Sequence, residues 1–183
     1  MDIEHEVNIT PIGVNVDGRQ LSLTTTGADL LKEVYHTMIG GYSKFYKMDL
    51  LCQLGWVASE LLLQAEGKER FVECDDRAIW LFGKHSSICT DRDYQQTIAD
   101  PAFFFPSPSL FVYTLPNIVT GEIALRNHYY AETSYFMIDN PALMKSYITV
   151  FLQTSPQIRT ALCGWIDATD VQTFLANIWL IKK

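Results

Sequence analysis

Between Thr133 and Pro141 the chain reads TSYFMIDNP, an apolar stretch that ends in a polar turn before a helical pattern. In several acyl-transfer enzymes a strand, sharp turn and helix present a nucleophile, because the helix N-terminus stabilises a thiolate and backbone N–H groups hold an oxyanion. Here the turn consists of Asp139, Asn140 and Pro141, so it contains neither cysteine nor serine. Asp or Asn before Pro also favours a helix start, and capping contributes about 1 kcal/mol. We expect a structural cap at Asp139–Asn140, with hydrogen bonding to a bound ligand as the alternative.

The cysteines are further candidates, because a thiolate is both a common nucleophile and a soft metal ligand. The four cysteines lie far apart without a CxxC pair, which favours free thiols. His85 and Cys89 have i,i+4 spacing, which could place two zinc ligands on one helix face. Tetrahedral zinc needs four ligands and no second pair is evident, so we expect neither a metal nor a cofactor. Cys163 reads as an inert residue in a buried strand.

The other polar candidates have ordinary structural interpretations. His5, His36 and His128 lie in the leading segment or near helix ends, and none pairs with a cysteine on a strand–turn–helix pattern. Glu132 is expected to be solvated. Asn117 and Gly121 are expected to cap and pack their helix, since glycine allows close approach to a sheet.

Hydrophobic periodicity predicts the elements that position these residues. Residues 5–23 alternate apolar and polar side chains around Asp17-Gly18, which predicts two strands and a turn, although Pro11 interrupts the first strand. Helices are expected over 48–65, after a cap at Thr90, over 117–129 and over 141–153. A buried strand is expected over 77–83, another over 133–138, and two more near the end of the chain. The alternation of strands and helices predicts an α/β domain with a mixed sheet.

Composition limits the function classes. The 183 residues are enough for one domain, taken as 1–183, and only 19% are charged, which suggests an extensive partner interface. The net charge of −7, without a basic run, argues against nucleic acid and against an anionic membrane surface. No signal peptide and no membrane-spanning stretch are apparent, so a cytoplasmic protein is expected.

Several segments in order carry a family resemblance. They are KMDLLCQLGWVASELLLQA, then AIWLFG, then PSPSLFVYTLPNIVTGEIALRNHYYAETSYFM, and finally ALCGWIDA, together covering roughly 48–168. In order and spacing they resemble the N-terminal half of β-ketoacyl-acyl-carrier-protein synthases, members of the thiolase superfamily. The resemblance implies a three-layer, half-thiolase-like α/β fold with a mixed, mostly parallel sheet. It also places Asp139, within a residue or two, where the family has its acyl-accepting cysteine.

The departures from that family suggest a function. The nucleophilic cysteine is missing, and the chain contains no second half, which in the family supplies the remaining catalytic residues. The leading hypothesis is a non-catalytic ketosynthase-like protein that binds a partner in fatty-acid or polyketide-type synthesis, as chain-length-factor subunits do. The partner would be a ketosynthase, with acyl-carrier protein as a further candidate. The alternatives are an acyl-transfer or thioester-hydrolysing enzyme using Cys89 or Ser134, and a structural homodimer without ligand.

The resemblance also predicts an interface. In the family, the strand before the nucleophile turn pairs antiparallel with its counterpart across a two-fold axis. The corresponding segment here is apolar and uncharged, and an open edge of this kind invites pairing. We therefore expect a dimer, with itself or with a ketosynthase, through Tyr135, Phe136, Met137 and the helix that starts at Asn117. The alternative is that the strand is internal and both sheet edges are covered.

Overall fold

The computed structural model describes residues 2–183, which form a seven-stranded sheet with the order β3-β2-β1-β7-β6-β4-β5. β4 runs parallel to both β5 and β6, and the other four neighbouring pairs are antiparallel. The α/β class and the mixed sheet are therefore as expected, and the parallel strands β6, β4 and β5 lie together at one end of the sheet. The strands are β1 Asp2–Thr10, β2 Gly13–Val16, β3 Arg19–Gln20, β4 Arg77–Gly83, β5 Thr133–Met137, β6 Thr160–Asp170 and β7 Thr173–Lys182.

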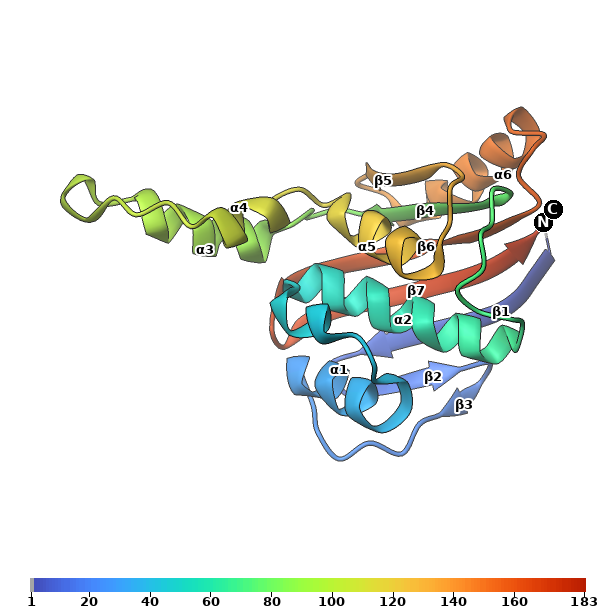
Figure 1. The fold of residues 1–183 in the computed structure, drawn as a ribbon, viewed down its shortest axis with the longest axis horizontal. Helices are drawn as coiled ribbons and strands as arrows, with labels where there is room; N and C mark the ends of the chain where they lie inside the picture. Colours follow the sequence, from blue (N-terminus) through green and yellow to red (C-terminus); the bar gives the residue numbers. More distant parts are fainter. Residues whose placement is uncertain (1) are drawn as a thin grey trace.

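Helices cover both faces of the sheet and complete three layers (Figure 1). α1, α2 and α5 lie on one face, and α6 lies on the other. The α-helices are α1 Ala28–Val34, α2 Leu50–Glu66, α3 Ile88–Ile98, α4 Pro108–Tyr113, α5 Ile118–Asn127 and α6 Met144–Thr154. Shorter turns of π- or 3₁₀-helix are Tyr35–Ile39, Ser43–Lys47, Pro101–Phe103 and Pro141–Leu143.

β4 divides the hydrophobic interior into two cores. All seven of its residues are buried, as expected of a central strand with helices on both sides. Because side chains alternate along a strand, Ile79 and Leu81 join the core beneath α2, whereas Trp80 and Phe82 join the core beneath α6. The expected buried strand at 77–83 is confirmed.

α3 and α4 form an arm that projects beyond the body of the sheet (Figure 1). At its tip Phe103, Phe104 and Phe105 are 70%, 58% and 75% exposed. The expected cap at Thr90 is wrong, because α3 already begins at Ile88. The Thr90 hydroxyl instead donates a 2.7 Å hydrogen bond to Asp49 on the body. α3 has polar residues on most of its sides, so the hydrophobic periodicity of the sequence does not locate its first residue.

The N-terminal hairpin has one turn more than expected. Asp17-Gly18 does form a tight turn, but this turn joins β2 to the short β3. β1 pairs with β2 across Pro11-Ile12, so the proline ends the first strand rather than interrupting it. This location suits proline, which cannot donate a hydrogen bond to a sheet ladder.

Two helical glycines have opposite surroundings. A Cβ on Gly55 in α2 would lie 2.6 Å from the Cγ2 atom of Val119 and 3.1 Å from the Cδ1 atom of Ile166. Gly55 therefore allows α2 to approach α5 and the sheet. At Gly121 in α5 a Cβ would meet nothing within 4 Å. The expectation that Gly121 packs closely is therefore wrong.

Candidate functional site

The parallel strands β4, β5 and β6 have their carboxyl ends on the same side of the sheet, where open α/β sheets usually carry their sites. The turn after β5 contains Asp139, whose side chain is 94% exposed and has an oxygen 3.8 Å from the Lys84 ammonium. The side chain of Asn140 accepts a 3.0 Å hydrogen bond from the N–H of Ala142, and Pro141 is the first residue of the following turn. The predicted cap is thus confirmed at Asn140, while Asp139 does not cap.

His85 also lies beside these carboxyl ends, in the loop between β4 and α3. Its Nδ1 atom is 2.6 Å from Oδ2 of Asp167 on β6. The other oxygen of Asp167 accepts backbone hydrogen bonds from Lys84 and His85, at 3.2 and 2.8 Å. The expectation that His85 and Cys89 share a helix face is wrong, because α3 begins only at Ile88. The His85–Asp167 contact instead fastens the base of the arm to the sheet.

β5 is the last strand of the sheet, so one of its backbone edges has no neighbour within residues 2–183. Hydrogen bonds from Ile79 N–H to Glu132 and from Ile138 N–H to Gly83 direct the even-numbered residues toward β4. By alternation, the N–H and C=O groups of Thr133, Tyr135 and Met137 face the open edge. The alternative of an internal β5 is therefore wrong.

The side chains at this edge differ in accessibility. Phe136 is partly buried, with its ring centroid 5.1 Å from that of Phe82 and 5.0 Å from that of Phe151. The hydroxyl of Tyr135 donates to the Ile166 carbonyl at 3.3 Å, and burial raises the pKa of this phenol. Met137 is 62% exposed. These strand residues surround an aromatic hollow of about 490 Å³, completed by Ile138 and Tyr147.

Asn117, the other predicted interface residue, lies immediately before α5. It is exposed at the start of α5, where the arm returns to the body, and its side chain makes no capping hydrogen bond. Its carbonyl accepts hydrogen bonds from the Gly121 N–H and the Thr120 hydroxyl. Asn117 is therefore the N-cap residue of α5, as expected, although the capping contact comes from its backbone carbonyl and not from its side chain.

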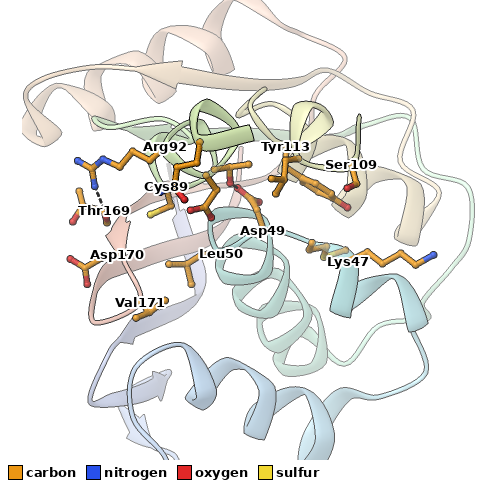
Figure 2. Close-up of a pocket in the computed structure, with 15 residues that line it drawn as sticks. Lys47, Asp49, Leu50, Cys89, Arg92, Ser109, Tyr113, Thr169, Asp170 and Val171 are labelled. Carbon is orange, nitrogen blue, oxygen red and sulfur yellow. Dashed lines mark hydrogen bonds between the residues drawn. The ribbon is translucent and has the colours of Figure 1, made fainter. Parts of the chain in front are cut away.

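A further hollow of about 470 Å³ lies between the arm and the body (Figure 2). Its walls come from the start of α2, from α3 and α4, and from the turn between β6 and β7. Asp49 lies among these groups and accepts hydrogen bonds from the Cys52 N–H and the Thr90 hydroxyl, at 2.9 and 2.7 Å. Burial raises the pKa of the Asp49 carboxyl, and burial also raises the pKa of Tyr113 to about 12. The sequence alone does not predict this hollow, because the residues that form its walls lie far apart along the chain.

Cys89, the alternative nucleophile, lines this hollow. Its thiol donates to the carbonyl of Ala168 at 3.6 Å, and burial raises its pKa, so the reactive thiolate is disfavoured. Ser134, the other alternative, donates to Glu132 at 3.5 Å rather than to a base of the Ser–His type. Neither residue has the surroundings of an activated nucleophile.

The remaining candidates have structural roles. Cys163 is fully buried in the core beneath α6, as expected, and burial raises its pKa. His5 contacts Asp17, His36 contacts Tyr46, and His128 ends α5 with φ 57°.

Within residues 2–183 no group of three or more His, Cys, Asp or Glu side chains could hold a metal ion. Over the same residues, none of the helices combines the length and apolar character required to span a membrane.

Comparisons with known proteins identify the fold. No protein-family model matches the sequence, and a search of curated proteins finds no match. Among solved structures, the chain is similar to the ishigamide ketosynthase/chain length factor, with TM-score 0.66 and 14% identity. It is also similar to a ketosynthase in complex with its chain length factor from Xenorhabdus doucetiae, with TM-score 0.60 and 15% identity.

The chain has the fold of these ketosynthase and chain length factor structures. Both matches cover 100% of this chain, but they cover only 62% of the first structure's chain and 79% of the second's. The half-thiolase-like architecture implied by the sequence resemblance is therefore supported. At 14–15% identity the comparison concerns the fold alone.

Proposed function

We propose that this protein is a non-catalytic, ketosynthase-like chain that binds a ketosynthase or an acyl-carrier protein in fatty-acid or polyketide-type synthesis. The observation that carries the proposal is the turn after β5. It holds the exposed carboxylate of Asp139 and the capping amide of Asn140, at the position where the sequence resemblance would place the family's thiol. An acyl group transferred to a carboxylate would form a mixed anhydride, which water hydrolyses, and not a stable thioester.

The open edge of β5 supports the partner-binding part of the proposal. An edge strand with free N–H and C=O groups is a template for another strand, and this one is short, apolar and uncharged. The two solved structures named above are ketosynthase and chain length factor pairs. A ketosynthase is accordingly the partner we propose, with the contact centred on Tyr135, Phe136, Met137 and the start of α5 at Asn117. A cytoplasmic location remains part of this proposal.

The alternative function is acyl transfer or thioester hydrolysis with another nucleophile. It is favoured by the position of Cys89 in the wall of a hollow large enough for a small organic group. The raised pKa of that thiol weighs against it.

A condensation assay tests the proposal. The purified chain is incubated with malonyl and acyl carrier proteins, and β-ketoacyl product is quantified by mass spectrometry. We expect product at the level of a blank without protein, because no thiol stands at the turn. Product that accumulates in proportion to the chain's concentration would refute the non-catalytic part of the proposal.

A further inference from the structure

A row of amide side chains crosses the sheet on the face that carries α6. The helix itself packs over β4 and β6, and the row extends from there toward β3, away from β5. Val7 and Ile9 of β1 lie in the core beneath α2. Because side chains alternate along a strand, Asn8 between them lies on the opposite face. The same alternation directs Asn177 of β7 and Asn15 of β2 to that face.

The strand register places these amides side by side. Asn177 is paired with Asn8 across β7 and β1, and Asn8 with Asn15 across β1 and β2. Asn15 is in turn paired with Gln20 of β3, and Trp165 of β6 is the neighbour of Asn177 at the other end. Five adjacent strands therefore contribute one residue each. Neighbouring strands lie about 4.8 Å apart, so the row is about 19 Å long.

The four amides are available to a ligand. Within residues 2–183 their side chains neither donate nor accept a hydrogen bond. Asn8, Asn15 and Asn177 are partly buried, and Oδ1 of Asn177 is buried without a partner. Buried polar groups are normally paired with protein, water or ligand. The unpaired oxygen of Asn177 calls for a hydrogen-bond donor.

The surface along the row is hollowed on both sides of the Asn177–Asn8 pair. A hollow of about 200 Å³ is lined by Asn8, Asn15 and Gln20. A second one, of about 360 Å³, lies beside the start of α6 and is lined by Asn177 and Trp165. The two hollows adjoin where Asn177 is paired with Asn8. A ligand that follows the row would therefore contact all four amides.

The chemistry of the row favours a neutral ligand with many hydroxyl groups. The row itself carries no charge, and Glu6 and Lys145 beside it have opposite signs. An amide donates through its nitrogen and accepts through its oxygen. A hydroxyl group also donates and accepts, so a pair of neighbouring hydroxyls matches one amide. Net anions and net cations gain no such match.

We propose that this amide row binds a neutral, extended oligosaccharide. The sugars of a cellulose-type chain repeat at nearly the spacing of the strands, so successive sugars would meet successive amides. The row would hold about four sugars, because it spans about four strand spacings. An extended peptide advances about 3.3 Å per residue and would fall out of step with this row. The half-exposed side chain of Leu175 would contact the apolar face of a sugar ring.

Isothermal titration calorimetry of the purified chain with cellohexaose tests the proposal. Saturable one-to-one binding is expected. Cellobiose should bind at least about tenfold more weakly, because it reaches only part of the row. Maltohexaose has the same composition but a curved chain, so its affinity should be reduced to a similar extent. Equal affinities for these sugars, or the absence of saturable binding of cellohexaose, would overturn the proposal.

Asn8→Ala removes the middle residue of the row. It should weaken cellohexaose binding about tenfold, as the loss of one or two neutral hydrogen bonds would give. Gln20→Ala at the exposed end should weaken it less. Asn117→Ala is the matched control, because this exposed side chain lies outside the row and makes no capping hydrogen bond. Circular dichroism verifies folding, and a folded Asn8→Ala with the affinity of wild type would contradict the assignment.

Nuclear magnetic resonance provides a measurement that needs no variant. The side-chain NH₂ signals of Asn8, Asn15, Asn177 and Gln20 should shift when cellohexaose is added, and that of Asn117 should not. Shifts confined to β5 or to the arm would place the sugar elsewhere and overturn the proposal. The row extends away from β5, and the titrations contain neither partner nor carrier protein. Their failure would therefore leave the proposed partner binding untouched.

Discussion

At the scale of the residue, Asp139 decides what the turn after β5 can do. Its carboxylate stands in water, 3.8 Å from the Lys84 ammonium, and the adjacent Asn140 supplies the cap. An exposed carboxylate is a weak nucleophile, because water already satisfies its charge, and it lacks the partner base that activates serine or cysteine. The same arrangement is, however, well suited to start a helix.

Cys163 illustrates a buried group with a packing role. Replacement by alanine should lower the free energy of unfolding by about 1 kcal/mol, because a fully buried side chain leaves a small cavity. Chemical denaturation of both proteins measures this difference. Partner binding should not change. A variant with unaltered stability that loses a binding activity would show that the thiol is functional.

Glu33 should contribute to acid sensitivity. Hydrogen bonds from the hydroxyls and N–H groups of Thr25 and Thr24 lower its pKa from 4.5 to about 2. The lowered pKa means that the stabilisation is fully present above pH 4.5 and is lost as the pH falls toward about 2. The melting temperature of wild type should therefore exceed that of Glu33→Gln at pH 6, and the gap should close between pH 4.5 and 2.

The exposed Glu69 in the loop after α2 is the matched control. The difference in melting temperature between wild type and Glu69→Gln should not decrease over the same pH range. A gap between wild type and Glu33→Gln that persists unchanged at pH 2 would contradict the account of Glu33.

At the scale of the element, the close packing of α2 requires a glycine, whereas the packing of α5 does not. A methyl group at Gly55 would press α2 against Val119 and Ile166, and overpacking of this kind costs about 1–3 kcal/mol. At the exposed Gly121, alanine gains helix propensity of about 1 kcal/mol without a clash. Gly55→Ala should therefore destabilise the protein and Gly121→Ala should stabilise it, as measured by denaturation. Effects of the same sign would refute this packing analysis.

Elements with strong hydrophobic patterns were predictable from the sequence. The apolar run of β4, the periodicity of α2 and the alternation in β6 and β7 each indicate the observed structure, because their apolar residues occupy the positions that become buried. The start of α3 and the surroundings of Gly121 were not predictable, since tertiary contacts determine them. The capping at Asn140 depends on neighbouring residues and was predicted.

The contacts around the candidate sites were harder to predict. The bonds of Thr90 to Asp49 and of His85 to Asp167 join residues 41 and 82 positions apart. A single sequence carries no signal for such pairs, and the hollow beneath the arm depends on them. The open edge of β5 likewise follows from strand order, and local sequence alone left both an edge and an internal strand possible.

At the scale of the whole molecule, assembly through β5 is the main prediction. We expect a dimer, with itself or with a ketosynthase, because a partner strand would satisfy the free N–H and C=O groups of this edge. Phe136→Asp should split the dimer, although Phe136 also packs on Phe82 and Phe151 and its loss risks unfolding. Met137→Pro is the sharper probe, since proline removes an N–H directed away from β4 and is tolerated on edge strands.

Size-exclusion chromatography with light scattering measures this assembly at micromolar concentration, and circular dichroism verifies that each variant is folded. Lys145→Met serves as the surface control, because Lys145 is exposed and does not line the hollow beside β5. A monomeric wild type that Phe136→Asp and Met137→Pro leave unchanged would remove the assembly proposal.

The central claim, that the turn holding Asp139 forms no acyl-enzyme, is tested most directly by intact-mass analysis. The purified chain is incubated with acyl-carrier protein thioesters and its mass is compared with that of the untreated chain. The account predicts an unchanged mass, because no activated thiol or hydroxyl stands at the turn and the Cys89 thiol has a raised pKa. A stable acyl adduct on any residue, Cys89 and Ser134 included, would contradict the non-catalytic account and favour an acyl-transfer enzyme.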